Sequence, residues 1–310
     1  MKHAIMASQP AGMVPRLPDI FRRYQEHVVT NWGDAANRMR TSSALMRARH
    51  QNHARKTWPS QRGFDDRLLQ IDESAEMAAD DQPMTFEQAV QAAVELDAPL
   101  NERLAVIAAA VRRIDGNFAD AVDRLVERLE KQGAGAAAPT PGDVMPPFLL
   151  PDDEGRLVGL ADILLKGPAV ITFQRGHWCP YCRLNAIGIV EVQQEIAALG
   201  GQIVAIMPER GKFARAMKSA VGASFPFLTD MDNGYALSLN LAIWIGAEME
   251  RLMGVAYDLP SYQGNSSWFL PIPATFIVGT DGVIMDRFVD PDYRRRMDID
   301  DLIAALRRAR

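Results

Sequence analysis

The chain has 310 residues, of which 48% are hydrophobic and 24% are charged, and its formal net charge is −5. This composition is typical of a globular protein with one large or two ordinary domains. The acidic balance argues against nucleic acid as the main partner, and no apolar run approaches the roughly 18–20 residues of a membrane span. The first residues lack the apolar core and small-residue cleavage site of a secretory signal, so we expect a cytoplasmic protein without a membrane partner.

Charge divides the N-terminal part of the chain into two segments of opposite sign. Residues 1–67 hold 12 Lys and Arg against 5 Asp and Glu, whereas residues 68–130 hold 5 against 14. We interpret residues 1–84 as a basic arm, partly helical or disordered, that leans on the acidic segment beside it. A targeting segment is an alternative interpretation of the same residues.

Residues 85–132 are predicted to form a helical extension. Thr85 followed by Gln88 is a plausible helix start, and apolar residues then recur at helical spacing. These apolar positions are Leu104, Ile107, Val111, Ile114, Val122, Leu125 and Leu129. The Gly-, Ala- and Pro-rich residues 133–142 are interpreted as a linker between this extension and a domain at 143–310.

The segment after the linker alternates between strand and helix patterns. Strands are expected at 169–173, 203–207, 227–229, 274–278 and 283–288, and helices after 182 and at 211–221, 235–242 and 300–308. Thr280-Asp281-Gly282 is a strong turn signal between the last two strands, and residues 246–270 are expected to be irregular. This order predicts an α/β protein with a thioredoxin-like fold, a central mixed sheet flanked by helices, joined to the N-terminal helical extension.

The only two cysteines, Cys179 and Cys182, lie three positions apart directly after the predicted strand 169–173. Thiol–disulfide exchange needs a thiolate that attacks and a second sulfur within reach. A spacing of three at the start of a helix supplies both, and the helix N-terminus lowers the pKa of the first thiol. We therefore expect Cys179 to be the nucleophile and Cys182 its resolving partner, with Pro180 in the first helical turn.

Other interpretations of this motif remain open. A CxxC pair can be half of a zinc site, for which His177 or the distant pair His50 and His53 would have to supply ligands. Two buried structural cysteines are another alternative. Arg175 and His177 could lower the thiol pKa further if they face the sulfur, although a lone histidine such as His177 is more often a solvated loop residue than a catalyst. Trp178 is expected to pack beside the site. We predict neither a metal nor a cofactor.

Several motifs resemble the AhpC/TSA family of peroxiredoxin-like proteins in the thioredoxin superfamily. Residues 173–183, FQRGHWCPYCR, resemble the FxRGxWCPYC signature of the bacterial members, with Tyr181 inside the motif. Residues 142–152 resemble the start of the family's domain, and 268–276 and 288–296 resemble its closing segments. The resemblance covers about residues 140–310, and residues 85–131 resemble a helical extension that such proteins often carry.

This resemblance implies a chemistry and partners. Cys179 would reduce a hydroperoxide or a disulfide, Cys182 would close a disulfide with it, and a thioredoxin-like reductant would recycle the pair. It also implies a supporting role for Pro273 and Thr275, with a cis Ile272–Pro273 bond opposite the cysteines. The oligomeric state is left open, with a homodimer as one option.

The chain departs from true peroxiredoxins at two positions. The family pattern has proline seven residues and threonine or serine three residues before the peroxidatic cysteine, where this chain has Thr172 and Gly176. Arg175 would replace the missing hydroxyl only in part. The missing hydroxyl favours a thiol–disulfide oxidoreductase, whereas the family resemblance favours a thiol-dependent peroxidase, which is the leading hypothesis. A thiol–disulfide oxidoreductase and a non-enzymatic redox-sensing module are the alternatives.

Overall fold

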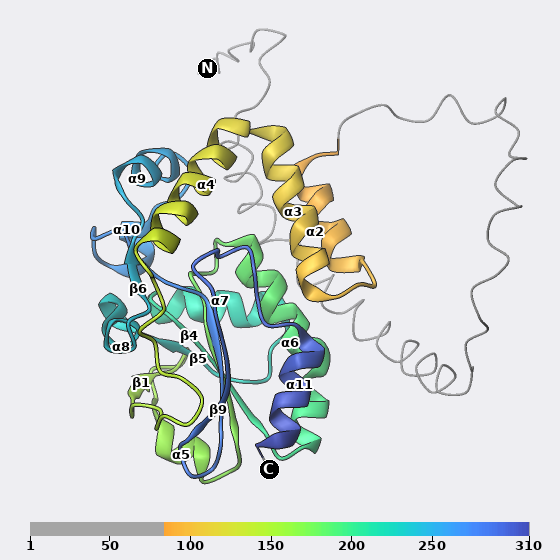
Figure 1. The fold of residues 1–310 in the computed structure, drawn as a ribbon, viewed down its shortest axis with the longest axis vertical. Helices are drawn as coiled ribbons and strands as arrows, with labels where there is room; N and C mark the ends of the chain where they lie inside the picture. The colour runs from red at the N-terminus through yellow and green to blue at the C-terminus, as the bar shows by residue number, and fades with distance from the viewer. Residues whose placement is uncertain (1–83, 310) are drawn as a thin grey trace, which may run out of the picture.

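The computed structural model describes residues 84–309 (Figure 1). The predictions for the basic arm before Met84, and for the pair His50 and His53, lie outside the described residues.

A five-stranded mixed sheet forms the centre of the molecule, with strand order β5-β4-β3-β8-β9. Strands β3, β4 and β5 are parallel, whereas β8 pairs antiparallel with β3 and β9 pairs antiparallel with β8. The strands are β3 (Ala169–Phe173), β4 (Gln202–Met207), β5 (Phe227–Thr229), β8 (Ala274–Val278) and β9 (Ile284–Val289). This is the mixed sheet of the predicted thioredoxin-like fold.

Successive residues of the central strands face opposite sides of the sheet, and each side is covered. Val170 of β3 belongs to one hydrophobic cluster and Ile171 to the other. Because both faces are buried, β3 is apolar at nearly every position rather than alternating. The helices over the first face are α6 (Pro180–Ala198), α7 (Gly211–Val221) and α11 (Ile299–Arg308), and those over the second are α5 (Leu160–Leu164) and α8 (Gly234–Ser238).

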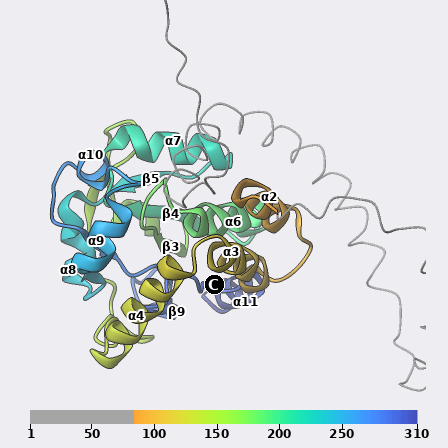
Figure 2. The same ribbon diagram turned by 90° about the horizontal axis from the view of Figure 1, so that it is seen from above.

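The predicted helical extension forms three helices, α2 (Phe86–Glu95), α3 (Leu100–Ile114) and α4 (Gly116–Lys131). Thr85 and Gln88 form the capping box expected from their spacing, with each side chain bonded to the other residue's backbone N–H. Figure 2 shows α2 and α3 beside α6, which they contact. One hydrophobic cluster includes Leu104 of α3, Leu125 of α4 and Leu184 of α6. The extension therefore shares its core with the first face of the sheet.

The segment 133–142, interpreted from the sequence as a linker, packs against strand β9. Ala138 is buried, and Arg287 donates to the carbonyl oxygens of Ala138 at 2.5 Å and Pro139 at 2.8 Å. Asn240 donates to the carbonyl of Ala137 at 3.1 Å. These contacts fix the path of the chain from α4 to the sheet. The division of the chain into segments 1–84, 85–132, 133–142 and 143–310 stays a prediction.

Two predictions between β5 and β8 were wrong. The helix expected at 235–242 ends at Ser238, because Asn240 adopts a left-handed conformation (φ 56°) that stops the helix. The residues expected to be irregular, 246–270, contain helices α9 (Ala247–Met253) and α10 (Leu259–Gln263) and strand β7 (Phe269–Pro271). Tertiary packing stabilises these short elements, since Met253 and Leu259 are buried.

Two small two-stranded sheets that the sequence did not indicate complete the fold. Strand β1 (Leu149–Pro151) pairs antiparallel with β2 (Leu157–Gly159), and β6 (Ala242–Trp244) pairs antiparallel with β7. The 3-10 helix η1 (Met231–Asn233) precedes α8. The predicted turn between β8 and β9 is confirmed, with Gly282 at φ 83° and the side chain of Asp281 accepting from the N–H of Val283.

The predicted cis peptide at Pro273 was wrong, because the described residues contain no cis peptide bond. The preceding residue, Ile272, is fully buried, and its N–H donates to the carbonyl of Leu241 at 2.7 Å. This hydrogen bond extends the pairing of β6 with β7 up to Pro273. The Ile272–Pro273 peptide bond has the trans geometry, which X–Pro bonds favour by about 0.5–1 kcal/mol.

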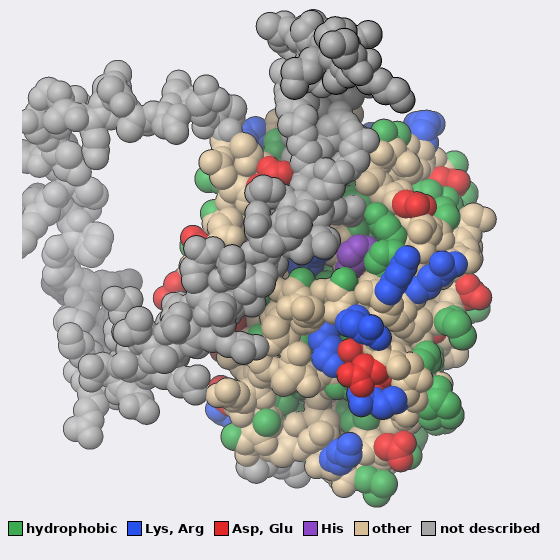
Figure 3. All heavy atoms as spheres, turned by 180° about the vertical axis from the view of Figure 1, so that it is seen from behind, with side chains coloured by type: hydrophobic (Ala, Val, Ile, Leu, Met, Phe, Trp, Pro, Cys, Tyr) green, Lys and Arg blue, Asp and Glu red, His purple; other side chains and the backbone are tan. Residues whose placement is uncertain are grey.

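Acidic side chains lie among basic ones on the face of the molecule drawn in Figure 3. The described ion pairs include Lys218–Asp153 at 3.0 Å, which ties α7 to the turn between β1 and β2. No helix among residues 84–309 is both long and apolar enough to cross a membrane.

Candidate redox centre

The cysteine motif joins the C-terminal end of the central strand β3 to the start of helix α6. Cys179 is the N-cap of α6, its N–H donates to the carbonyl of Gly176 at 3.2 Å, and Pro180 occupies the first turn. Proline fits this position because the first N–H groups of a helix have no intrahelical partner. The strand-to-helix junction therefore fixes both sulfurs on the first turn of α6.

Both cysteines are free thiols and both are buried, with relative exposures of 1% for Cys179 and 0% for Cys182. The two side chains hydrogen-bond to each other. Cys182 also accepts from the backbone N–H of Arg175, at 3.3 Å, and from Nη2 of Arg296, at 3.4 Å. Cys182 therefore receives three donors, which is the environment of a sulfur that carries negative charge.

Two buried guanidinium groups flank the sulfurs. Arg175 lies over the ring of Tyr293, with its Cζ 3.8 Å from the ring centroid, and hydrogen-bonds to the same side chain. It also lies 5.1 Å from the ring centroid of Trp178. Arg296 reaches the pair from the segment between β9 and α11. The charge around the cysteines is thus strongly positive.

This arrangement gives the two thiols opposite pKa shifts. Burial raises the pKa of Cys179 well above 9.0, and the hydrogen bond and charge of Cys182 raise it further. Burial also opposes ionisation of Cys182, but the hydrogen bond from Cys179 and the charges of Arg296 and Arg175 lower its pKa to about 6. The contact of the Arg296 side chain with the second sulfur, at 3.4 Å, was not foreseen from the sequence, and the assignment of Cys179 as the nucleophile stays a prediction.

His177 is held by a buried carboxylate that the sequence analysis did not identify. Glu209 is fully buried, and its carboxylate accepts from the backbone N–H of His177 at 2.7 Å and contacts Nδ1 of His177 at 2.8 Å. The imidazole also stacks on Phe213, with ring centroids 4.8 Å apart, and meets the edge of Tyr262. His177 is therefore not a solvated loop residue. It anchors the loop in front of Cys179.

A small cavity of about 20 Å³ opens onto Cys179, and Cys182 is not among its lining residues. Aromatic side chains form much of its wall, namely Trp178, Tyr181, Tyr257 and Tyr293. Val111 of α3 and Phe118 of α4 line it as well, so the helical extension contributes directly to the site. A volume of this size accommodates roughly one water-sized molecule.

The other predicted site residues are only partly brought together. Trp178 and Pro180 line the cavity beside Cys179, as does Tyr181, whose ring meets Tyr293 edge-on at 5.4 Å. Pro273 and Thr275 are buried, and neither lines the cavity in the described part of the chain. Thr275 pairs instead with Thr172 across β3 and β8. The roles expected for Pro273 and Thr275 stay predictions.

Three functional residues missed from the sequence, Glu209, Tyr293 and Arg296, come from two distant segments. Glu209 follows β4, and the carboxyl ends of the parallel strands β3 and β4 lie at the same edge of the sheet. The position of Glu209 directly after a strand parallel to β3 could therefore have indicated that it lies near the cysteine motif. Tyr293 and Arg296 stand in a segment noted for its family resemblance but given no role. Within residues 84–309, no group of three or more His, Cys, Asp or Glu side chains is placed to hold a metal ion.

Comparison with known proteins identifies the family of this chain. The model of the AhpC/TSA family matches residues 141–287. A protein of Mycobacterium tuberculosis named "Putative peroxiredoxin" is 33% identical over 147 residues, which are 47% of this chain and 82% of that relative. The chain belongs to the AhpC/TSA family. The predicted resemblance is thereby confirmed.

Other members of the redox superfamily are more distant from this AhpC/TSA protein. The thiol-disulfide oxidoreductase ResA of Bacillus subtilis is 27% identical over 154 residues, covering 49% of this chain and 69% of ResA. Among solved structures, the peroxidoxin BcpB of Mycobacterium tuberculosis aligns with a TM-score of 0.44 and 21% identity, covering 55% of this chain and 98% of BcpB.

Proposed function

We propose that this protein is a thiol peroxidase that reduces small hydroperoxides at Cys179. The observation that carries the proposal is the cavity of about 20 Å³ at Cys179, with a second thiol and two buried guanidinium groups behind it. The cavity accommodates a peroxide of a few atoms, and Cys179 lines it while being otherwise buried, at 1% exposure. Membership of the AhpC/TSA family supports the same activity.

The proposed reaction balances as follows. The thiolate of Cys179 attacks one oxygen of the peroxide, the O–O bond breaks, Cys179 becomes a sulfenic acid, and the released alkoxide or hydroxide takes up a proton. The thiolate of Cys182 then attacks the sulfur of Cys179 and expels hydroxide, which is protonated to water, leaving the Cys179–Cys182 disulfide. A dithiol reductant of the thioredoxin type returns both sulfurs to the reduced state.

The central test is single-turnover oxidation of the reduced protein by hydrogen peroxide. Trp178 lies beside Cys179, so its fluorescence reports the reaction in a stopped-flow experiment. We expect rapid oxidation, and we expect Cys179→Ser to reduce its rate by more than about 10³-fold because the nucleophile is lost. Reduction of insulin disulfides is measured in parallel. Slow oxidation with brisk insulin reduction would instead support a thiol–disulfide oxidoreductase, and inertness in both assays would support a redox-sensing module.

The cavity wall yields a prediction about substrate size. Phe118→Ala removes a ring that lines the cavity from α4, and the wider cavity should admit bulky organic hydroperoxides. We expect the ratio of the rate with cumene hydroperoxide to the rate with hydrogen peroxide to rise about 10-fold or more, the usual effect of pocket-shape changes of this size. Val122→Ala is the matched control, because Val122 is buried on the same helix and does not line the cavity. An unchanged ratio in Phe118→Ala would show that α4 does not limit substrate size.

A further inference from the structure

The wall of the redox cavity contains a second sulfur-bearing residue besides Cys179. This residue is Met253, the last residue of helix α9, which lines the cavity and is otherwise buried, at 2% exposure. Met249 lies one turn earlier on the same helix and is equally buried, but it does not line the cavity. A molecule small enough to enter the cavity therefore meets Met253 as well as Cys179.

A thioether in this position can react with a hydroperoxide. The sulfur attacks one oxygen of the peroxide, the O–O bond breaks, and that oxygen stays on the sulfur as a sulfoxide. The other oxygen leaves with the transferred hydroxyl proton as water or an alcohol. While Cys179 is reduced, its thiolate is the better nucleophile and consumes the peroxide. Once Cys179 and Cys182 have formed the proposed disulfide, Met253 still offers a sulfur that can be oxidised.

We propose that Met253 is an oxidation site through which excess peroxide closes the cavity and stops turnover. This inference rests on the proposed peroxidase function, because a peroxide has to enter the cavity. The cavity of about 20 Å³ accommodates roughly one water-sized molecule, and the oxygen of a sulfoxide is of about that size. An oxygen on Met253 therefore fills the space that a peroxide needs beside Cys179.

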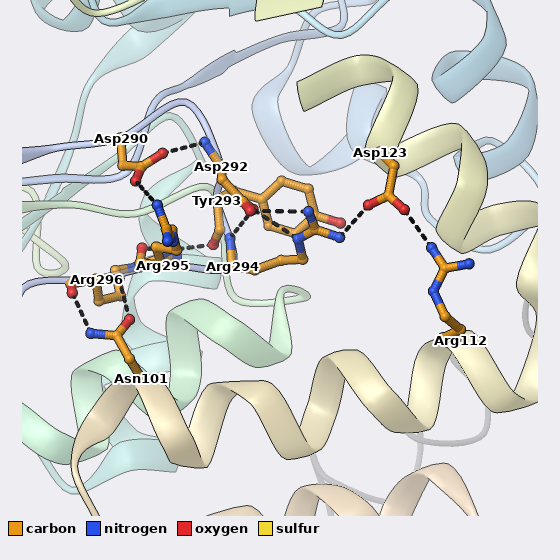
Figure 4. Close-up of polar contacts among 9 residues, drawn as sticks. All are labelled: Asn101, Arg112, Asp123, Asp290, Asp292, Tyr293, Arg294, Arg295 and Arg296. Carbon is orange, nitrogen blue, oxygen red and sulfur yellow. Dashed lines mark hydrogen bonds and ion pairs between the residues drawn. The ribbon is translucent and has the colours of Figure 1, made fainter. Parts of the chain in front are cut away.

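The surroundings of Met253 leave the added oxygen little other space. Met253, Tyr257 and Tyr293 belong to one hydrophobic cluster, and inserting atoms into a packed core costs about 1–3 kcal/mol. The carbonyl of Met253 accepts from the N–H of Tyr257 at 2.8 Å, which fixes these two parts of the wall relative to each other. Arg294, next to Tyr293, is bound to Asp123 of α4 at 2.7 Å (Figure 4). The wall is therefore held from several elements, and the cavity is the space left for the oxygen.

Peptide mapping by mass spectrometry tests the site. The full-length protein is exposed to excess hydrogen peroxide without a reductant, reduced with dithiothreitol and digested, and the sulfoxide at each methionine is followed with time. We expect Met253 to be oxidised at least about 10-fold faster than Met249, which a peroxide reaches only when the structure opens locally. In the Cys179→Ser protein the sulfoxide at Met253 should appear without a delay, because no thiolate at that position competes for the peroxide.

The oxidation rate of Cys179 after such exposure tests the closing of the cavity. Each protein is reduced again and compared with its own rate before exposure, and molecules with a sulfinic acid at Cys179 are counted separately by mass. The wild type should lose activity in proportion to the sulfoxide at Met253. Met253→Leu should keep most of its own rate, because leucine has a similar volume and is not oxidised. Met249→Leu is the matched control and should lose activity as the wild type does.

The possible outcomes separate this inference from the proposed function. Rapid oxidation of Cys179 together with equal oxidation of Met253 and Met249 would overturn the inference alone. Equal losses of activity in Met253→Leu and the wild type would show that the sulfoxide does not close the cavity. Slow oxidation of Cys179 in the unexposed wild type would count against the peroxidase, while the ratio of Met253 to Met249 oxidation in Cys179→Ser still decides whether peroxide reaches the site.

Discussion

Glu209→Ala is expected to lower the free energy of unfolding by about 3–5 kcal/mol. The fully buried carboxylate of Glu209 accepts from the backbone N–H of His177 and contacts its imidazole, so alanine leaves two buried polar groups of His177 without that partner. Urea-induced unfolding of the reduced protein measures the change. The oxidation rate of Cys179 should fall as well, because the loop before it loses its anchor.

Glu209→Gln is the control for this prediction. Glutamine keeps a carbonyl oxygen that can accept from the N–H of His177, so a smaller loss of about 1–2 kcal/mol is expected. If alanine and glutamine cost the same, or if alanine costs less than about 1 kcal/mol, the carboxylate does not anchor the loop.

Gly176→Ala should damage the redox centre directly. A Cβ at position 176 would lie 2.3 Å from Nε1 of Trp178 and 2.8 Å from Oε1 of Glu209, and the backbone has φ +154°. Trp178 is buried between Arg175 and Tyr257, so it cannot move aside freely. We expect a loss of about 2–4 kcal/mol in stability, measured by urea unfolding, and a fall of at least about 10-fold in the oxidation rate of Cys179.

The matched control for Gly176→Ala is Gly211→Ala in the first turn of α7. A Cβ there would meet no atom closer than 3.9 Å, so stability and oxidation rate should stay close to those of the wild type. Wild-type behaviour of Gly176→Ala would mean that the loop can open without cost, contrary to the packing described above.

Much of the fold was predictable because its signals are local. The buried strand Ala169–Phe173, the capping box at Thr85 and the turn at Gly282 each depend on a few adjacent residues, and each was found where the sequence placed it. The short helices α9 and α10 could not be recognised, because so few residues carry no clear periodicity and their stability comes from distant packing.

In the candidate site, too, the local features were predictable from the sequence and the contacts between distant segments were not. The CxxC motif and Arg175 are visible in the sequence, since strand, loop and helix follow one another there. The contact of Arg296 with the second sulfur was not predictable from that segment, because Arg296 lies 114 residues after Cys182. Val111 was placed among the apolar positions of the predicted extension and Phe118 was given no role, and only the folded chain brings both to the cavity.

The position of Arg296 also bears on the recovery of the oxidised protein. Of the two sulfurs only that of Cys179 lines the cavity, so in the proposed disulfide a reductant thiol would attack Cys179 and Cys182 would be the leaving group. A thiol of lower pKa leaves faster, and the guanidinium that contacts Cys182 stabilises it as it departs. Arg296 would therefore favour reduction of the proposed disulfide at Cys179.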